Sequence, residues 1–134
     1  MSFREWYKEQ FSETLKEPLS DSDRIPDDEI DRLLDGREIP LALRDYYRVA
    51  GRHWMNSNYD RLLAPNELRR EHSHIMFMDE NQNVGHWGFN QEDAAENDPE
   101  VYLGQWEGDD FVWYDQGQTL SRFIIESWLE TCTG

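Results

Sequence analysis

The stretch 75–89 constrains the fold most strongly, because it has the pattern of a β-hairpin. An apolar run at 75–78 precedes five turn-forming residues at 79–83, and β-branched and aromatic residues return at 84–89. Asn and Asp tolerate left-handed backbone and bond their own main chain, so a turn is expected at 79–83. Two glycines in the second run favour a bulge or a close approach, which predicts a bend in that arm.

Helical spacing of apolar residues predicts three helices before this hairpin and one after it. Pro26 and Pro40 are suited to helix starts, and Gly36 and Gly51 to the ends of the same two helices. The last helix is expected to take Thr119 or Ser121 as its N-cap. The four expected helices span residues 3–16, 26–36, 40–51 and 119–129.

Shorter elements fill the remainder of the chain. The sequence predicts an extended segment at 62–63, a small helix at 66–71 after Pro65, and an acidic loop at 90–100. Two more strands, at 101–106 and 111–114, are joined by a tight turn. Helices, then consecutive strands, then a closing helix predict an α+β fold with a central, mainly antiparallel sheet flanked by N-terminal helices and a C-terminal helix. A length of 134 residues fits one domain, 1–134.

Charge is distributed unevenly along the chain. Residues 1–70 carry 15 acidic and 12 basic side chains, a net of -3, whereas residues 71–134 carry 14 acidic side chains and one basic, a net of -13. An acidic surface of this kind repels nucleic acid and attracts basic proteins. The expected partner is therefore a protein with a basic surface, with neither nucleic acid nor a membrane bound.

The compartment is inferred from cysteine use and hydropathy. Cys132 is the single cysteine, which excludes an internal disulfide framework and suits a reducing cytoplasm. The mean hydropathy is -0.94, and no apolar run approaches the length of a membrane span. The N-terminus shows no signal-peptide pattern. A cytoplasmic location is the expectation.

Residues with catalytic potential form no recognisable constellation. His72, His74 and His86 lie near Asp79 and Glu80, but this metal-site signal is weak, and we expect solvated histidines at a sheet edge. Most carboxylates fall in loops, where the raised pKa of a catalytic acid is not expected. No serine or cysteine lies in a nucleophile motif, and no glycine-rich phosphate loop precedes a helix. We expect no enzyme activity, no metal and no cofactor.

Aromatic residues are abundant and are first read as core. Trp113 and Tyr114 are adjacent in one expected strand, so they should face opposite ways. Trp106 beside the turn at 107–110 is expected to be partly exposed. An exposed aromatic side chain ringed by carboxylates is typical of a protein-binding hot spot.

Three strings of the sequence carry a family resemblance. They are Ile-Pro-Leu-Ala-Leu-Arg-Asp-Tyr-Tyr-Arg-Val-Ala-Gly at 39–51, Leu-Ala-Pro-Asn-Glu-Leu at 63–68 and Phe-Met-Asp-Glu-Asn-Gln-Asn-Val-Gly-His-Trp-Gly at 77–88. Together they resemble the SUKH superfamily, which includes the yeast Smi/Knr cell-wall-assembly regulators and bacterial immunity proteins of contact-dependent and polymorphic toxin systems. The likeness covers residues 26–130; nothing is carried over for the N-terminal helix, 1–17. It implies a sheet flanked by helices and a role in blocking a cognate toxin. The family-motif residues, expected to be structural, are Gly51, Glu80, Asn81, Gln82, Trp87 and Gly88.

The combined interpretation is a non-catalytic protein-binding module, an immunity protein that neutralises a toxin, with a nuclease as one candidate because its active site is basic. One alternative is a regulatory scaffold of the Smi/Knr type. Another is a small-ligand-binding domain whose pocket is lined by Trp54, Trp87 or Trp113. The expected partner-binding residues are Glu92, Asp93, Glu96, Asp98, Trp106, Glu107, Asp109 and Asp110.

Overall fold

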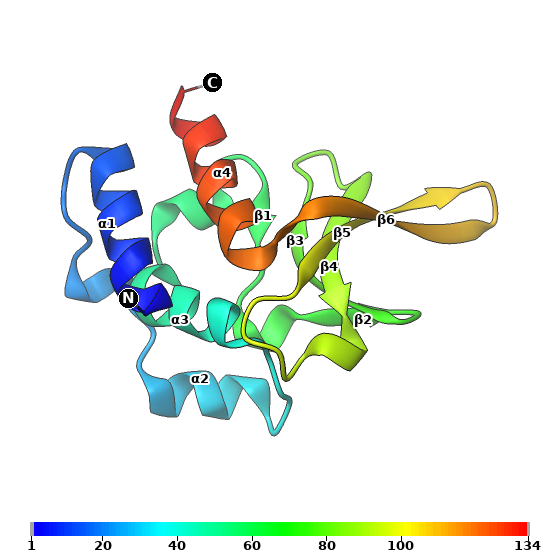
Figure 1. Ribbon diagram of the computed structural model, residues 1–134, viewed down its shortest axis with the longest axis horizontal. Coiled ribbons are helices and arrows are strands. Elements are labelled where there is room, and N and C mark those ends of the chain that lie inside the picture. The colour runs from blue at the N-terminus through cyan, green and yellow to red at the C-terminus, as the bar shows by residue number, and fades with distance from the viewer. Residues whose placement is uncertain (1, 134) are drawn as a thin grey trace.

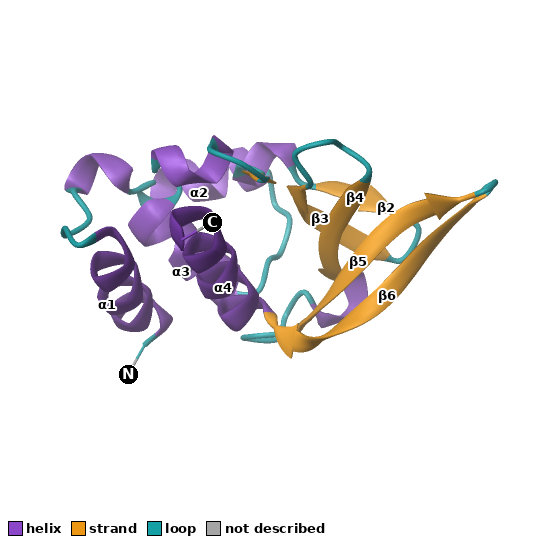
Figure 2. Cartoon of the chain, turned by 90° about the horizontal axis from the view of Figure 1, so that it is seen from above, coloured by secondary structure: helices purple, strands orange, loops and turns teal. Residues whose placement is uncertain are grey.

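The computed structural model describes residues 2–133 and confirms the α+β class, with the helices gathered beside the sheet (Figures 1 and 2). Within those residues the α-helices are α1 (Phe3–Leu15), α2 (Asp27–Leu34), α3 (Leu41–Ala50) and α4 (Leu120–Thr133). The strands are β1 (Arg61–Leu62), β2 (Arg69–Glu71), β3 (His74–Asp79), β4 (Gly85–Asn90), β5 (Glu100–Glu107) and β6 (Asp110–Thr119). None of these helices is both long and apolar enough to cross a membrane.

The sheet is antiparallel throughout, in the order β1-β3-β4-β5-β6, with β2 also paired to β3. The predicted central hairpin is confirmed as β3 and β4. Its irregularity lies in β3, between Met76 and Met78, rather than in β4 as expected. Gly88 on β4 does serve a close approach, because a Cβ there would lie 2.4 Å from the main-chain oxygen of Ile75.

The prediction of a small helix at 66–71 is wrong. A 3-10 turn, Pro65–Glu67, is followed at once by β2, whose residues pair with β3 from Met76 to His74. Tertiary pairing therefore overrides the local helix signal after Pro65. The strand predicted at 111–114 is also too short, because β6 continues to Thr119 past a register shift.

Of the two glycines predicted to end helices, Gly51 is the C-cap of α3 as expected, whereas Gly36 lies one residue beyond the C-cap of α2. Asp35 caps α2 in the left-handed region, with φ 51°, and Gly36 follows with φ 84°. Gly51 follows α3 with φ -59°, which any residue can adopt. Its small size is what matters, because a Cβ at Gly51 would lie 2.5 Å from Cδ1 of Ile25.

Aromatic rings join the helices to one another and to the sheet. Phe11 of α1 stacks on Trp128 of α4 with 3.9 Å between ring centroids, so the N-terminal helix belongs to the core. Phe123 of α4 packs edge-on against Phe77 of β3 and lies 5.4 Å from the ring of Trp87 on β4. These contacts place α4 on one face of the sheet. The opposite face is not covered by α4.

Candidate functional site

The hairpin of β5 and β6, residues 100–119, projects beyond the body of the protein (Figures 1 and 2); we call it the acidic arm. Its strands pair from Glu107↔Asp110 back to Tyr102↔Asp115. Gly108 has φ 66° at the first central position of the two-residue turn, where a type II′ turn requires glycine. The turn chemistry thus fixes the register of the arm.

Aromatic side chains line the face of the arm that α4 does not cover. Phe111 contacts Trp113 at 5.2 Å between ring centroids, and Trp113 stacks on His74 of β3 at 4.5 Å. A Cβ at Gly104 would lie 2.5 Å from Phe111 and 2.6 Å from Trp113, so glycine lets both rings lie across the strand. The indole of Trp113 also reaches β2, so the sheet is curled and this face is concave.

Trp106 stands at the outer end of this aromatic row. It packs edge-on against Phe111, at 5.4 Å, yet 60% of its surface is exposed, which confirms the expected exposure. Tyr114 lies on the other face of the arm, where its hydroxyl donates to Glu107. Trp113 and Tyr114 therefore face opposite ways, as predicted. An exposed indole held by a packed ring is a rigid apolar anchor.

Two pairs of carboxylates lie close together, one pair within the arm and one within the preceding loop. A hydrogen bond with Asp115, together with its charge, raises the pKa of Glu100. The charge of Asp93 raises the pKa of Glu96 in the loop. Hydrogen bonds from Tyr114 and then Gln105 lower the pKa of Glu107, which keeps that carboxylate ionised. A neighbouring cation would relieve the repulsion within both carboxylate pairs.

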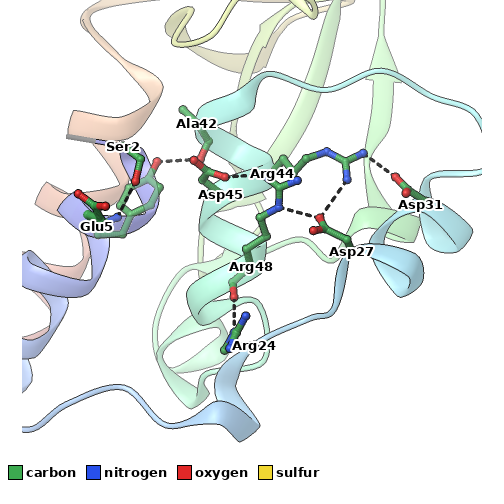
Figure 3. Close-up of polar contacts among 10 residues, drawn as sticks. Ser2, Glu5, Arg24, Asp27, Asp31, Ala42, Arg44, Asp45 and Arg48 are labelled. Atoms are coloured by element: carbon green, nitrogen blue, oxygen red, sulfur yellow. Dashed lines mark hydrogen bonds and ion pairs between the residues drawn. The ribbon is translucent and has the colours of Figure 1, made fainter.

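Several carboxylates of the helices form ion pairs with arginines, whereas those of the arm form none within residues 2–133. Arg44 contacts Asp31 at 2.7 Å, and Arg48 contacts Asp27 and Asp45, each at 2.7 Å (Figure 3). Within residues 2–133, no carboxylate that follows Asp79 in the sequence lies within ion-pair distance of a lysine or arginine. The negative charge of the arm is thus left uncompensated.

The structure separates the expected partner-binding residues into two groups. The loop residues precede β5, whereas the turn residues lie at its far end and in the turn after it, so the length of β5 holds the two groups apart, by roughly 20 Å. The loop group is Glu92, Asp93, Glu96 and Asp98, and the turn group is Trp106, Glu107, Asp109 and Asp110.

Asp98 has a structural task within the loop group. Its carboxylate accepts the N–H of Ser121 at 2.9 Å and the hydroxyl of Ser121 at 2.7 Å. Asp98 therefore satisfies donors at the start of α4, the place where Thr119 or Ser121 was expected to act as the cap. The turn group, with Trp106, is the more exposed candidate.

The residues of the resembled motif lie at packing and turn positions. Trp87 and Gly88 contact the core as described above, and Gln82 is exposed in the turn. The N–H of Asn81 donates to the Asp60 carboxylate at 2.9 Å, so the main chain of the motif is tied by a neighbouring loop. Glu80 Oε1 is buried with no hydrogen-bond partner among residues 2–133.

The expectation of solvated histidines is wrong for His74 and His86, which are 6% and 9% exposed. Nδ1 of His86 donates to Oδ1 of Asp79 at 2.7 Å, and Nη2 of Arg69 contacts the same oxygen at 2.8 Å. Burial raises the pKa of Asp79, but the hydrogen bonds from Arg69 and His86 outweigh it, and the pKa lies below its usual value. The sequence held a signal for this cluster, because the hairpin register places Asp79 opposite His86.

A polar hollow of about 650 Å³ opens beside this cluster, lined by Tyr59, Arg61, Asn81 and others. Its lining contains none of the tryptophans expected of a small-ligand pocket. Both oxygens of Asp79 face cationic side chains, Oδ1 toward Arg69 and Oδ2 toward Arg61 at 3.6 Å, so both oxygens of this carboxylate already have partners within the protein. No group of three or more His, Cys, Asp or Glu residues in the described part of the chain could hold a metal ion.

Comparisons with known proteins add no relative: no protein-family model, no curated protein and no solved structure matches this chain. The resemblance of residues 26–130 to the SUKH superfamily stays a prediction. The geometry and charge of the acidic arm are therefore the features that indicate a function.

Proposed function

We propose that this protein is a non-catalytic binding module that neutralises a basic protein toxin, in the manner of an immunity protein. The single observation that carries the proposal is the acidic arm, which projects from the body with no lysine or arginine of residues 2–133 paired to its carboxylates and with Trp106 exposed beside its turn. Charge supplies attraction and the indole supplies an anchor. Together they are the parts of a protein-recognition surface.

The negative charge of residues 71–134 supports a basic partner, because it would speed association with a positively charged protein. A net of -13 over residues 71–134 steers a positively charged protein toward this half of the chain. Repulsion within the Glu100–Asp115 pair would be relieved by a lysine or arginine from the partner. A nuclease fits this description well, because its active site must hold phosphates and is basic for that reason.

The position of Trp106 supports a specific rather than a purely electrostatic complex. Acidic residues alone attract many basic proteins, whereas a buried aromatic anchor discriminates between them. Trp106 is held by Phe111, and Phe111 by Trp113, so little side-chain entropy is lost when a partner covers the indole.

Capture from the native cell extract tests the proposal. The tagged 134-residue chain is used as bait at low and then moderate salt, and bound proteins are identified by mass spectrometry. One dominant basic protein, retained with roughly nanomolar affinity, weakened by salt and inhibited by the bait, is the expected result. A set of cell-wall and signalling proteins with modest affinity would overturn the toxin proposal in favour of a regulatory scaffold.

A further inference from the structure

Strand β6 forms one edge of the sheet. Among residues 2–133 it pairs with β5 alone, and its outer side faces away from the other strands (Figure 2). Free strand edges carry unpaired N–H and C=O groups that can pair with another chain. A long edge strand on a projecting arm is therefore an available template for main-chain hydrogen bonding.

The turn determines which main-chain groups of β6 are free. Hydrogen-bonded and non-hydrogen-bonded pairs alternate along an antiparallel ladder, and the pair that closes a two-residue turn is a hydrogen-bonded one. Counting from Glu107↔Asp110, the main-chain groups of Phe111, Trp113 and Asp115 point away from β5. Those of Asp110, Val112 and Tyr114 are directed toward it.

The regular part of the free edge ends at Asp115. The N–H of Gly117 donates to the Asp115 carboxylate at 2.8 Å, and Gly117 has φ 69°. The register with β5 also shifts between Glu100 and Tyr102 at this level. The usable edge is thus residues 110–115, enough for one short strand.

We infer that the basic partner binds by adding an extended strand to the free edge of β6 at residues 110–115. This inference rests on the proposed function and names the mode of recognition at the same arm. Strand addition draws affinity from the main chain and specificity from alternate side chains. One face of the added strand would lie beside Phe111 and Trp113 of β6, and the other beside Asp110 and Tyr114, while Trp106 lies on β5 across from Phe111.

Charge selects the occupant of this edge. A second copy of the chain would bring its own Asp110 and Asp115 against those of the first, and like charges across paired strands are destabilising. A segment that alternates basic and apolar residues meets Asp110 beside Val112 and Tyr114 on one face of β6, and Asp115 beside Phe111 and Trp113 on the other, so each face offers a carboxylate and apolar side chains. A basic extended segment of a partner protein is therefore the occupant that fits.

A peptide titration followed by amide hydrogen exchange tests this inference on the isotopically labelled full chain. The probe is an eight-residue peptide of alternating lysine and valine. Its matched control has the same sequence with every main-chain amide methylated, which preserves charge and side chains but removes the donors needed for a strand. We expect the unmodified peptide to bind about tenfold more tightly than the control.

The exchange pattern supplies the specific readout. Saturation with the unmodified peptide should slow exchange about tenfold at Phe111, Trp113 and Asp115. Exchange at Asp110, Val112 and Tyr114 should stay unchanged because those amides already pair with β5. Equal binding of both peptides without this alternation would overturn strand addition but leave the acidic arm as a binding surface.

Two further outcomes also decide against the inference. Binding of neither peptide would overturn strand addition, while the capture of a natural basic partner would still decide the proposed function. Alternating protection that depends on protein concentration and needs no peptide would show that a second copy occupies the edge.

Discussion

The indole Nε1 of Trp113 donates a hydrogen bond to the main-chain oxygen of Glu71 at 3.3 Å. Trp113 lies on β6 and Glu71 on β2, which are at opposite edges of the sheet. The bond therefore spans the concave face and fixes the acidic arm against the rest of the sheet. His74 also holds the indole of Trp113 in place, because the two rings stack.

Replacing Trp113 by Phe should reduce the free energy of unfolding by about 1 kcal/mol, because the ring contacts largely survive and the hydrogen bond does not. Trp113→Ala should cost about 3 kcal/mol, since the ring contacts are lost as well. Urea unfolding measures both values. Tyr114→Phe is the matched control on the opposite face and should stay within about 0.5 kcal/mol of the parent. Equal values for all three variants would contradict the bridging role.

Much of this fold is encoded in local sequence patterns. The β3–β4 hairpin and the helices at 3–15 and 27–34 follow from periodicity, prolines and turn residues that act over a few positions. Strand β2 could not be found in this way, because three charged residues, Arg69 to Glu71, acquire their extended form only by pairing with β3.

The candidate site was predictable in part. The exposure of Trp106 and the acidic turn follow from the Glu-Gly-Asp-Asp sequence at 107–110. To predict that the loop group and the turn group lie far apart, one would have to know the length and direction of β5. The capping role of Asp98 required knowledge that residue 98 meets Ser121, which lies 23 positions later in the chain.

Asp98→Ala should destabilise the protein by about 1 kcal/mol, because the donors of Ser121 lose their acceptor at the start of α4. Affinity for the captured partner should not change, since the acidic arm is left intact. Chemical denaturation and a binding titration measure the two effects. Glu92→Ala, an exposed residue of the same loop, is the matched control and should alter stability by less than about 0.5 kcal/mol. A loss of affinity without a loss of stability would place Asp98 in the interface instead.

Acidification should weaken the fold through His74. Burial lowers the pKa of His74, against an opposing effect of Asp93, so the neutral ring is favoured in the folded state. Because the unfolded chain takes up this proton first, the stabilisation is complete above the unfolded pKa of about 6.5. It is lost as pH falls from there toward the folded pKa. Burial also lowers the pKa of His53, which adds a loss of the same sign.

The histidine effect is isolated by comparison with His74→Gln. Between pH 7.5 and about 5.5, the parent should lose more free energy of unfolding than the variant. Urea titrations at several pH values in that range measure the difference. Parallel profiles for the two proteins would show that His74 does not contribute to the pH dependence.

Reversing three charges at the turn, with Glu107→Lys, Asp109→Lys and Asp110→Lys together, should slow association with the basic partner about tenfold or more at low salt. The dependence of the association rate on salt should also weaken. Stopped-flow or surface-binding kinetics measure both quantities. The matched control carries Glu9→Lys, Glu13→Lys and Glu17→Lys, which changes net charge equally from exposed sites in and just beyond α1. Equal slowing by both triple variants would mean that net charge, rather than the turn, directs association.

Truncation of Trp106 separates anchoring from charge. Trp106→Ala should weaken partner binding by about 2 kcal/mol, roughly thirtyfold, mainly through faster dissociation. The free protein should lose no more than about 1 kcal/mol, since the indole is 60% exposed and packs on one ring among residues 2–133, that of Phe111. Trp54→Ala is the matched control, because Trp54 is 56% exposed but belongs to the turn after α3 rather than to the acidic arm. Calorimetric titration of both variants measures the affinities, and thermal unfolding measures their stability. If the two truncations weaken binding equally, the anchor does not lie on the arm; if only Trp106→Ala does, the partner covers the end of the arm where β5 turns into β6.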